Sequence, residues 1–426
     1  MTLNELVKVV NGETSLNSNE VIKEIKIDSR KINEGDIFIA LKGPNYDGQD
    51  FVNDAIEKGA IACITEKILN DKCIKVESGI HALFSISNYI RNEYKIPVIA
   101  ITGSNGKTTT KDLIVQILKN KYNVLYNEGS KNNIIGVSDT LFKLNNNYNM
   151  CVLELGTNHL GEIKELSLMC NPTLGVITNI GTSHIGFFKS KKNIFKEKTS
   201  ITYGMYNNKL IVNGDDRYLK KLNCIKCGLG KNNDLKAYNI ESYVDHISFN
   251  IYLDKEYKIV FNHPGVHFVN NILLAIKVGL IYDINVDEII KSIYDYSMTS
   301  MRMNIVRVGS NTIINDCYNA SYESIKAGIN YLKNINQDKI IILGDILELG
   351  KYSKKMHKKV NKLVKKINNK EVFTIGEHSK CINGLNFDNV EVFIRHLKDI
   401  KISNKYIYIK GSRRMHLEKI VEYLKK

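Results

Sequence analysis

The sequence predicts an α/β protein of three domains, in which a central, mostly parallel sheet of the P-loop type is flanked by a small N-terminal α/β domain and a C-terminal Rossmann-like α/β domain. The chain has 426 residues, more than one hydrophobic core usually holds, and 43% of them are hydrophobic. Short apolar runs alternate with segments of helical periodicity along the whole chain. The clearest run is "IPVIAIT" (96–102), which ends in a glycine loop and precedes a helical pattern at 107–122.

The apolar runs fall into three groups, which we interpret as domains at 1–85, 86–305 and 306–426. A helix is expected in 47–60 of the first group, and helical patterns separate the strands of the other two, as a mostly parallel sheet requires. The expected strands lie within residues 24–30, 35–41, 60–65, 73–76, 96–102, 150–156, 173–181, 208–216, 311–321, 339–345, 371–376 and 405–412.

Composition narrows the classes of function. The formal charge of +15 is spread along the chain, and tryptophan is absent, so a solvated lysine-rich surface is favoured over a nucleic-acid site. The eight cysteines lack the regular spacing of a disulfide framework, and Cys224 and Cys227 have no second Cys or His pair nearby to complete a zinc site. No apolar run approaches the roughly 20 residues of a membrane helix, and no signal-peptide pattern is present, so a cytoplasmic protein without a membrane span is expected.

The glycine loop has the chemistry of a phosphate-binding loop. Its residues are Gly103, Ser104, Asn105, Gly106, Lys107, Thr108 and Thr109. Glycine lets the backbone approach phosphate oxygens, the helix N-terminus favours an anion, Lys107 supplies a cation and Thr108 a hydroxyl for magnesium. Ile101 stands where the longer form of the motif has glycine, so we interpret this as a shorter loop; the alternative is an ordinary glycine turn before a helix.

Three further polar residues are candidates for the site, and two of them stand near the ends of apolar runs. Glu154 is near the end of a predicted buried strand, where a carboxylate is costly unless it binds something, and a metal carried by a nucleotide would be a suitable partner. His184 follows the next strand, at the edge where open sheets bind ligands. Taken alone, a histidine at the position of His184 is more often structural, and Lys198, fourteen residues on, would be read as a solvated helix lysine.

Together these segments resemble the Mur ligase family, ATP-dependent amide-bond enzymes of cell-wall (peptidoglycan) precursor synthesis. The shorter phosphate loop is that family's form, and the resemblance runs nearly end to end. It rests on "DSRKINEGDIFIALKGPNYDGQDF", "ITGSNGKTT", "NNIIGV", "LELGTNHLGEI", "NIGTSHIGFF", "FKEKTSI", "GVHFVNNILLA", "DCYNAS", "LGDILELG" and "KGSRRM".

The motifs "LELGTNHLGEI", "DCYNA" and "LGDILELG" favour the branch that joins D-alanyl-D-alanine to UDP-N-acetylmuramoyl-tripeptide through an acyl phosphate. The alternatives are a sister Mur-type or folylpolyglutamate-like ligase with another acceptor, a nucleotide-binding protein without catalysis, and a nucleic-acid-stimulated ATPase. The resemblance implies a protein that closes its domains on ATP, and we expect a monomer that binds no nucleic acid.

The resemblance also implies the catalytic and metal residues. Lys107 would act at the transferred phosphate of ATP, and Thr108 and Glu154 would hold one Mg²⁺. Glu154, His184 and a carbamylated Lys198 would hold a second, because the carbamate formed with CO₂ offers the anionic oxygen that magnesium prefers.

The remaining contacts follow in the same way. Asn271 would contact adenine, Arg302 the phosphates and Asp316 the ribose; the alternatives are a helix asparagine, a surface arginine and a turn aspartate. The other predicted substrate-binding residues are Ser29 and Arg30 near the uridine group, Asn133, Asn158 and His159 in the central domain, Tyr318 and Asn319 at the ATP-facing strand end, and Lys410, Ser412 and Arg413 near the substrate carboxylates. The chain departs from the family pattern at Gln49, Phe268, Met301, Ser321 and Tyr322.

Overall fold

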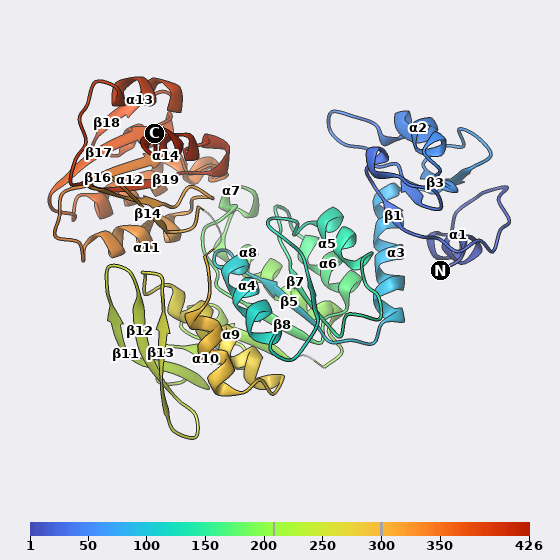
Figure 1. Ribbon diagram of the computed structural model, residues 1–426, viewed down its shortest axis with the longest axis horizontal. Coiled ribbons are helices and arrows are strands. Elements are labelled where there is room, and N and C mark those ends of the chain that lie inside the picture. Colours follow the sequence, from blue (N-terminus) through green and yellow to red (C-terminus); the bar gives the residue numbers. More distant parts are fainter. Residues whose placement is uncertain (208, 299–300) are drawn as a thin grey trace.

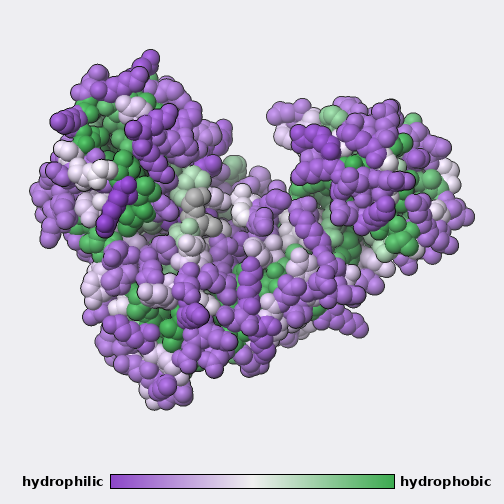
Figure 2. Space-filling model, in the orientation of Figure 1, coloured by the Kyte–Doolittle hydropathy of each residue, from purple (hydrophilic) through white to green (hydrophobic). Residues whose placement is uncertain are grey.

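The computed structural model describes residues 1–207, 209–298 and 301–426, and it confirms the three-unit α/β architecture. Each unit is built on its own sheet, and the N-terminal and C-terminal units lie on opposite sides of the central one (Figure 1). Figure 2 shows the surface hollowed between these two outer units, with mainly hydrophilic residues around the hollow. No helix among the described residues is both long and apolar enough to cross a bilayer.

The N-terminal sheet has four parallel strands in the order β1-β2-β3-β4. Its strands are short but almost entirely buried at β2 and β3, because helices cover them. The helix α3 leads from this unit into the central one (Figure 1). The elements are α1 (Leu3–Val10), β1 (Ile25–Lys26), β2 (Ile37–Ile39), α2 (Val52–Glu57), β3 (Ala62–Thr65), β4 (Cys73–Lys75) and α3 (Gly79–Glu93).

The central sheet has nine strands in the order β13-β12-β11-β10-β9-β8-β5-β7-β6. Its strands are parallel from β6 to β11, and β12 and β13 add an antiparallel hairpin. The strands are β5 (Val98–Thr102), β6 (Val124–Tyr126), β7 (Met150–Glu154), β8 (Leu174–Ile177), β9 (Leu210–Asn213), β10 (Ile225–Gly228), β11 (Leu235–Ser242), β12 (Ile247–Tyr252) and β13 (Glu256–Phe261).

All residues of β5, β7 and β8 are buried, since helices lie on both faces of the sheet. The neighbours of β5 are β8 and β7, so the loops that follow these three strands meet at one edge of the sheet, where open α/β sheets bind ligands. The helices are α4 (Lys107–Leu118), α5 (Ile134–Leu141), α6 (Glu162–Cys170), α7 (Ile185–Phe188), α8 (Lys191–Thr199), α9 (Phe268–Ile281) and α10 (Val286–Tyr294).

The C-terminal sheet has six strands in the order β14-β15-β19-β16-β17-β18, and only β14 is antiparallel to its neighbour. The elements are β14 (Asn304–Val308), β15 (Asn311–Asn315), α11 (Tyr322–Leu332), β16 (Lys339–Gly344), α12 (Ser353–Val364), β17 (Lys370–Ile375), β18 (Leu385–Phe387), α13 (Val390–Leu397), β19 (Tyr406–Lys410) and α14 (Glu418–Leu424).

One apolar core joins the central and C-terminal units. It contains the central strands and also residues of α11, α12 and β16, such as Ile329, Leu343 and Val360. The N-terminal sheet has separate cores, centred on Leu6 and Phe38. The N-terminal unit meets the central one through α3, which packs on α5 and α6, and through Ile135 and Phe142, which pack against the core that contains Leu6.

Candidate active site

A cavity of about 610 Å³ lies between the central and C-terminal units. From the central unit it is lined by the loops that follow β5, β7 and β8, and from the C-terminal unit by the loops that follow β15 and β16 and by the last residue of β19. The site is therefore built where carboxyl ends of parallel strands from two sheets face each other.

The phosphate loop is held in a shape that requires glycine. Gly103 has φ +145°, and a Cβ there would lie 1.9 Å from Thr178 Oγ1. Asn179 fixes the loop, because its carbonyl accepts the N–H of Ser104 at 3.0 Å and its side-chain oxygen that of Asn105 at 3.0 Å. Lys107 begins α4, and its Nζ donates to Gly103 O at 3.1 Å. The loop thus presents backbone N–H groups at the N-terminus of α4, an arrangement that suits a phosphate.

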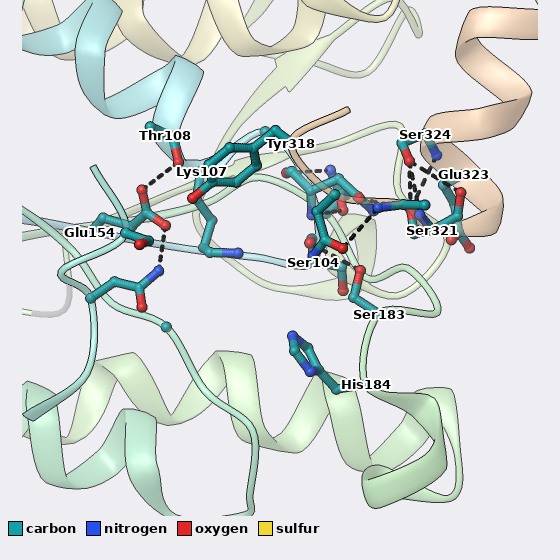
Figure 3. Close-up of a pocket in the computed structure, with 18 of the residues that line it drawn as sticks. Ser104, Lys107, Thr108, Glu154, Ser183, His184, Tyr318, Ser321, Glu323 and Ser324 are labelled. Carbon is teal, nitrogen blue, oxygen red and sulfur yellow. Dashed lines mark hydrogen bonds between the residues drawn. The ribbon is translucent and has the colours of Figure 1, made fainter. Parts of the chain in front are cut away.

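Thr108 and Glu154 form the polar centre of the cavity (Figure 3). The Thr108 hydroxyl donates to Glu154 Oε2 at 2.7 Å and accepts from Arg302 Nη2 at 3.0 Å, while Asn132 donates to Glu154 Oε1 at 2.8 Å. Glu154 is only 2% exposed. A hydroxyl and a carboxylate are hard oxygen donors, so this pair fits the magnesium ion that the sequence predicts.

Asn127 fixes the backbone of Glu154 on both sides. Its Oδ1 accepts the Glu154 N–H at 2.8 Å, and its Nδ2 donates to Glu154 O at 2.9 Å. Lys111, itself buried, donates to Asn127 O at 2.7 Å. The position of Glu154 is therefore set by residues that lie behind the cavity wall.

Lys198 is 3% exposed and lies on α8, outside the cavity lining. Burial, followed by the nearby charge of Lys107, lowers the pKa of Lys198 well below its usual value. The neighbouring Glu197 accepts the N–H groups of Gly161 at 2.7 Å and Ile163 at 2.8 Å and the hydroxyl of Thr157 at 3.0 Å. Glu197 therefore ties α8 to the start of α6.

His184 immediately precedes α7 and has φ +56°. Its Nδ1 lies 2.6 Å from Glu348 Oε2 of the C-terminal unit, and this contact lowers the pKa of Glu348. Figure 3 shows His184 apart from Thr108 and Glu154. Within the described ranges, no three His, Cys, Asp or Glu side chains converge on a metal position. His184 therefore contacts the C-terminal unit through Glu348 in this arrangement, and the grouping of Glu154, His184 and Lys198 stays a prediction.

The C-terminal unit brings a second charged pair to the cavity. Lys410 Nζ lies 2.6 Å from Asp316 Oδ2, and Tyr408 donates to the same oxygen at 3.1 Å. Arg302 lies over the Tyr318 ring, with its central carbon 3.8 Å from the ring centroid. Asp316, Tyr318, Asn319 and Lys410 all line the cavity, together with Arg302.

Some of the other predicted residues line the cavity, and the rest lie outside its lining. Asn133, Asn158 and Asn271 line the cavity. His159 is exposed and lies 3.3 Å from Glu162, outside the lining.

Ser412 and Arg413 do not line the cavity either. The Ser412 hydroxyl is buried and accepts the N–H of Leu347, and Arg413 pairs with Glu418 at 3.3 Å. Ser29 and Arg30 belong to the N-terminal unit; Arg30 is exposed, and its hydrogen bond lowers the pKa of Asp28 to about 2.

Several departures from the family pattern have a physical account. Met301 has φ +65°, the left-handed region that favours glycine, so it occupies a glycine-like position at a conformational cost. Ser321 caps α11 and donates from Oγ to Asn105 Oδ1 of the phosphate loop at 2.8 Å. Phe268 packs on Phe261, with ring centroids 5.5 Å apart.

Sequence reasoning missed the residues that hold the site from outside or across the domain border: Asn127, Asn132, Asn179, Glu197, Glu323 and Glu348. Four of them, Asn132, Asn179, Glu197 and Glu348, lie within the family motifs, so their motifs were the signal that could have identified them. For Asn127 no signal was visible, since its partners are set only by the fold.

Comparison with known proteins agrees with this geometry. Three family models match consecutive parts of the chain: "Mur ligase family, catalytic domain" at 21–106, "Mur ligase middle domain" at 101–279 and "Mur ligase, glutamate ligase domain" at 301–424.

Relatives match over nearly the whole length. UDP-N-acetylmuramoyl-tripeptide--D-alanyl-D-alanine ligases from Buchnera aphidicola and Rickettsia prowazekii are 35% and 33% identical, over 95% and 96% of this chain and 92% and 96% of theirs. A crystal structure of MurF from Acinetobacter baumannii superposes with a TM-score of 0.93 at 27% identity, covering 100% of this chain and 99% of that one. The chain belongs to the Mur ligase family and, within it, to the MurF group.

Proposed function

We propose that this chain is an ATP-dependent, ADP-forming ligase that joins D-alanyl-D-alanine to UDP-N-acetylmuramoyl-tripeptide in peptidoglycan precursor synthesis. The proposal rests on one observation: the phosphate loop, the Thr108–Glu154 pair and the Asp316–Lys410 pair all line the same cavity. The names of the relatives that match over the full length supply the two substrates.

The residues of the cavity suit a reaction between anions. ATP and a peptide carboxylate repel each other, so the site must offset their charge before phosphoryl transfer can make the acyl phosphate. Lys107 and the N–H groups at the start of α4 would hold the phosphates. Arg302, which donates to the Thr108 hydroxyl in this structure, would break that hydrogen bond and contact the phosphates instead. Positioning of the two reactants would then contribute much of the rate.

Thr108 and Glu154 would hold the magnesium ion that accompanies ATP, since both offer oxygen. When bound, such an ion would stabilise negative charge on the phosphates. The residues around Glu154 would keep its carboxylate in place, because Asn127 and Asn132 fix its backbone and one of its oxygens.

Lys198 would carry the carbamate. The lowered pKa favours the neutral amine, which is the form that adds CO₂, and burial shields the product from solvent. In protein equilibrated with ¹³C-bicarbonate, a carbamate carbon signal should appear and be absent in Lys198→Ala. The activity of that variant should fall at least 100-fold and recover in part with formate or acetate. A ¹³C spectrum identical in both proteins would contradict the modification.

The N-terminal unit, residues 1–85, would bind the UDP-sugar near Ser29 and Arg30, while residues 86–305 would bind ATP and residues 306–426 would close on it. Each of the three units comes from one chain, so a monomer would suffice. We place the reaction in the cytoplasm, where ATP is available.

Phosphate release from ATP would test the reaction, with UDP-N-acetylmuramoyl-tripeptide fixed and D-alanyl-D-alanine present or absent and with the product followed by mass. We expect release coupled to a product heavier by the dipeptide, and at least 1,000-fold less in Lys107→Ala. Release with a different amine instead would indicate a sister ligase. Absence of both phosphate and product from folded protein would overturn the proposal.

A further inference from the structure

A second cavity, of about 330 Å³, lies at the border of the central and C-terminal units and has an unusually cationic lining. Two lysines come from the central unit, Lys189 and Lys191, and two from α12, Lys355 and Lys359. The remaining lining residues are Thr182, Ile185, Ser190, Tyr322, Glu323, Tyr352 and Met356.

The one acidic side chain of this crevice is already engaged. Glu323 lies 3.2 Å from Lys191 Nζ, and it accepts the Thr182 hydroxyl at 2.6 Å and the Thr182 N–H at 3.1 Å. Lys189, Lys355 and Lys359 form no ion pair with any carboxylate in the part of the chain that the structure describes. The crevice therefore concentrates positive charge that the protein itself does not neutralise.

The helix α12 keeps this charge at a cost. Its sequence, "SKKMHKKVNKLV", contains no acidic residue, and Lys355 and Lys359 are one turn apart, where like charges destabilise a helix. Lys359 is oriented by the Tyr322 ring, with its Nζ 5.5 Å from the ring centroid. Lys359 is exposed, and this contact places its ammonium beside a ring that also lines the crevice.

The two walls are tied to each other and to the large cavity. The Tyr352 hydroxyl, from the C-terminal unit, donates to the Lys189 carbonyl of the central unit. Thr182 and Glu323 line both cavities, so they form the partition between them. A ligand in the crevice would touch both units beside the candidate active site.

We propose that this crevice binds a compact anion with two or more phosphate groups. Lysine ammonium groups act as point charges that bind phosphate, and the Ser190 hydroxyl adds a donor. The volume is at the lower end of small-ligand sites, which suits a short polyphosphate better than a whole nucleotide. Because the lysines come from two units, the bound anion favours the arrangement that brings them together.

Binding of inorganic tripolyphosphate, measured by titration calorimetry on the full chain, tests this inference. Saturating ADP occupies the phosphate loop beforehand, and magnesium is left out so that the probe stays free. We expect one site in the wild-type protein and at least tenfold weaker binding in Lys355→Gln/Lys359→Gln, with ADP affinity unchanged within twofold.

The matched control is Lys365→Gln/Lys366→Gln, which removes the same charge from exposed positions just beyond α12, outside the crevice. It should bind tripolyphosphate within twofold of wild type. If both double variants weakened tripolyphosphate binding equally, the binding would depend on the general surface charge and not on the crevice, and the proposal would be overturned. Absence of binding once ADP is saturating would overturn it as well, because the phosphate loop would then be the only site. Neither result depends on ligase activity, so the proposed function is tested separately.

Discussion

Glu197 is a buried residue that does not line the cavity but holds one of the loops that do. Its carboxylate accepts two backbone N–H groups and the Thr157 hydroxyl. In Glu197→Ala the N–H groups of Gly161 and Ile163 lose their acceptor. Water can reach the exposed Gly161, but Ile163 is buried, and a buried donor without an acceptor costs about 1–3 kcal/mol. We expect the central unit to lose about 1–3 kcal/mol of unfolding free energy in chemical denaturation.

The matched control for this variant is Lys196→Ala, the exposed neighbour on the same helix, which should change stability by less than about 0.5 kcal/mol. Because Glu197 also orients the loop with Asn158, KM for the peptide substrate should rise more than kcat falls. Equal stability of the two variants would show that the contacts of Glu197 do not hold the loop.

His357 should make the C-terminal unit sensitive to acid. Its Nε2 accepts the Ile346 N–H at 3.1 Å and its Nδ1 lies 2.9 Å from Ser353 O, an arrangement that requires the neutral ring. Burial lowers the pKa of His357, with smaller and opposed contributions from Asp345 and His378.

Since the folded-state pKa is below the unfolded value of about 6.5, the unfolded chain binds the proton first as pH falls. Stability is therefore retained above pH 6.5 and lost below it, by up to about 1.4 kcal/mol per pH unit. In denaturation curves between pH 7.5 and 5, the stability advantage of wild type over His357→Gln should shrink. A constant difference over that range would contradict this account.

At the scale of elements, the phosphate loop depends on the backbone of one glycine. Gly103→Ala would place a methyl group where Thr178 Oγ1 now lies, in a region of φ that alanine rarely adopts. The loop would have to move away from β8, so we expect ADP affinity to fall at least tenfold by calorimetry. Gly129→Ala is a suitable control, since a Cβ there meets nothing within 4 Å, although its φ is also positive. Unchanged ADP affinity in Gly103→Ala would mean that the loop adapts at little cost.

Strands that are buried on both faces could be predicted from their apolar residues. Strands whose formation depends on pairing with a neighbouring strand could not. The strands β5, β7, β8 and β16 are fully buried, so each consists mostly of apolar residues, and all four were expected. The hairpin β12–β13 was not expected, because an antiparallel edge strand such as β13 alternates buried and exposed residues over only a few positions.

The same distinction holds for the site. Thr108 was predicted from the phosphate-loop motif and Glu154 because it ends a buried strand, and the two residues do meet. Ser412 was predicted from its motif; it does not line the cavity itself, but its hydroxyl accepts the N–H of Leu347, which does. The contact of His184 with Glu348 joins residues 164 positions apart on two units, and no local pattern encodes it.

At the scale of the whole molecule, the distribution of apolar cores determines how the units unfold. The central unit and one face of the C-terminal sheet share a core, and polar contacts such as Ser321 to Asn105 and Glu323 to Thr182 reinforce their border. The N-terminal unit has its own cores, and α3 leads from it to the rest. Units with separate cores can unfold independently, whereas units with a shared core are coupled.

We therefore expect two transitions in scanning calorimetry, one for the N-terminal unit and one for the central and C-terminal units together. ADP should raise the temperature of the second transition only, because the ligand binds that part of the folded chain. At a concentration 100 times its Kd, ADP should add about 2.7 kcal/mol to the unfolding free energy of that part. Leu6→Ala, in the fully buried N-terminal core, should lower only the first transition, by about 2–5 kcal/mol. A single transition that responds to both ADP and Leu6→Ala would mean that α3 couples all three units, and three transitions would mean that the shared core contributes little.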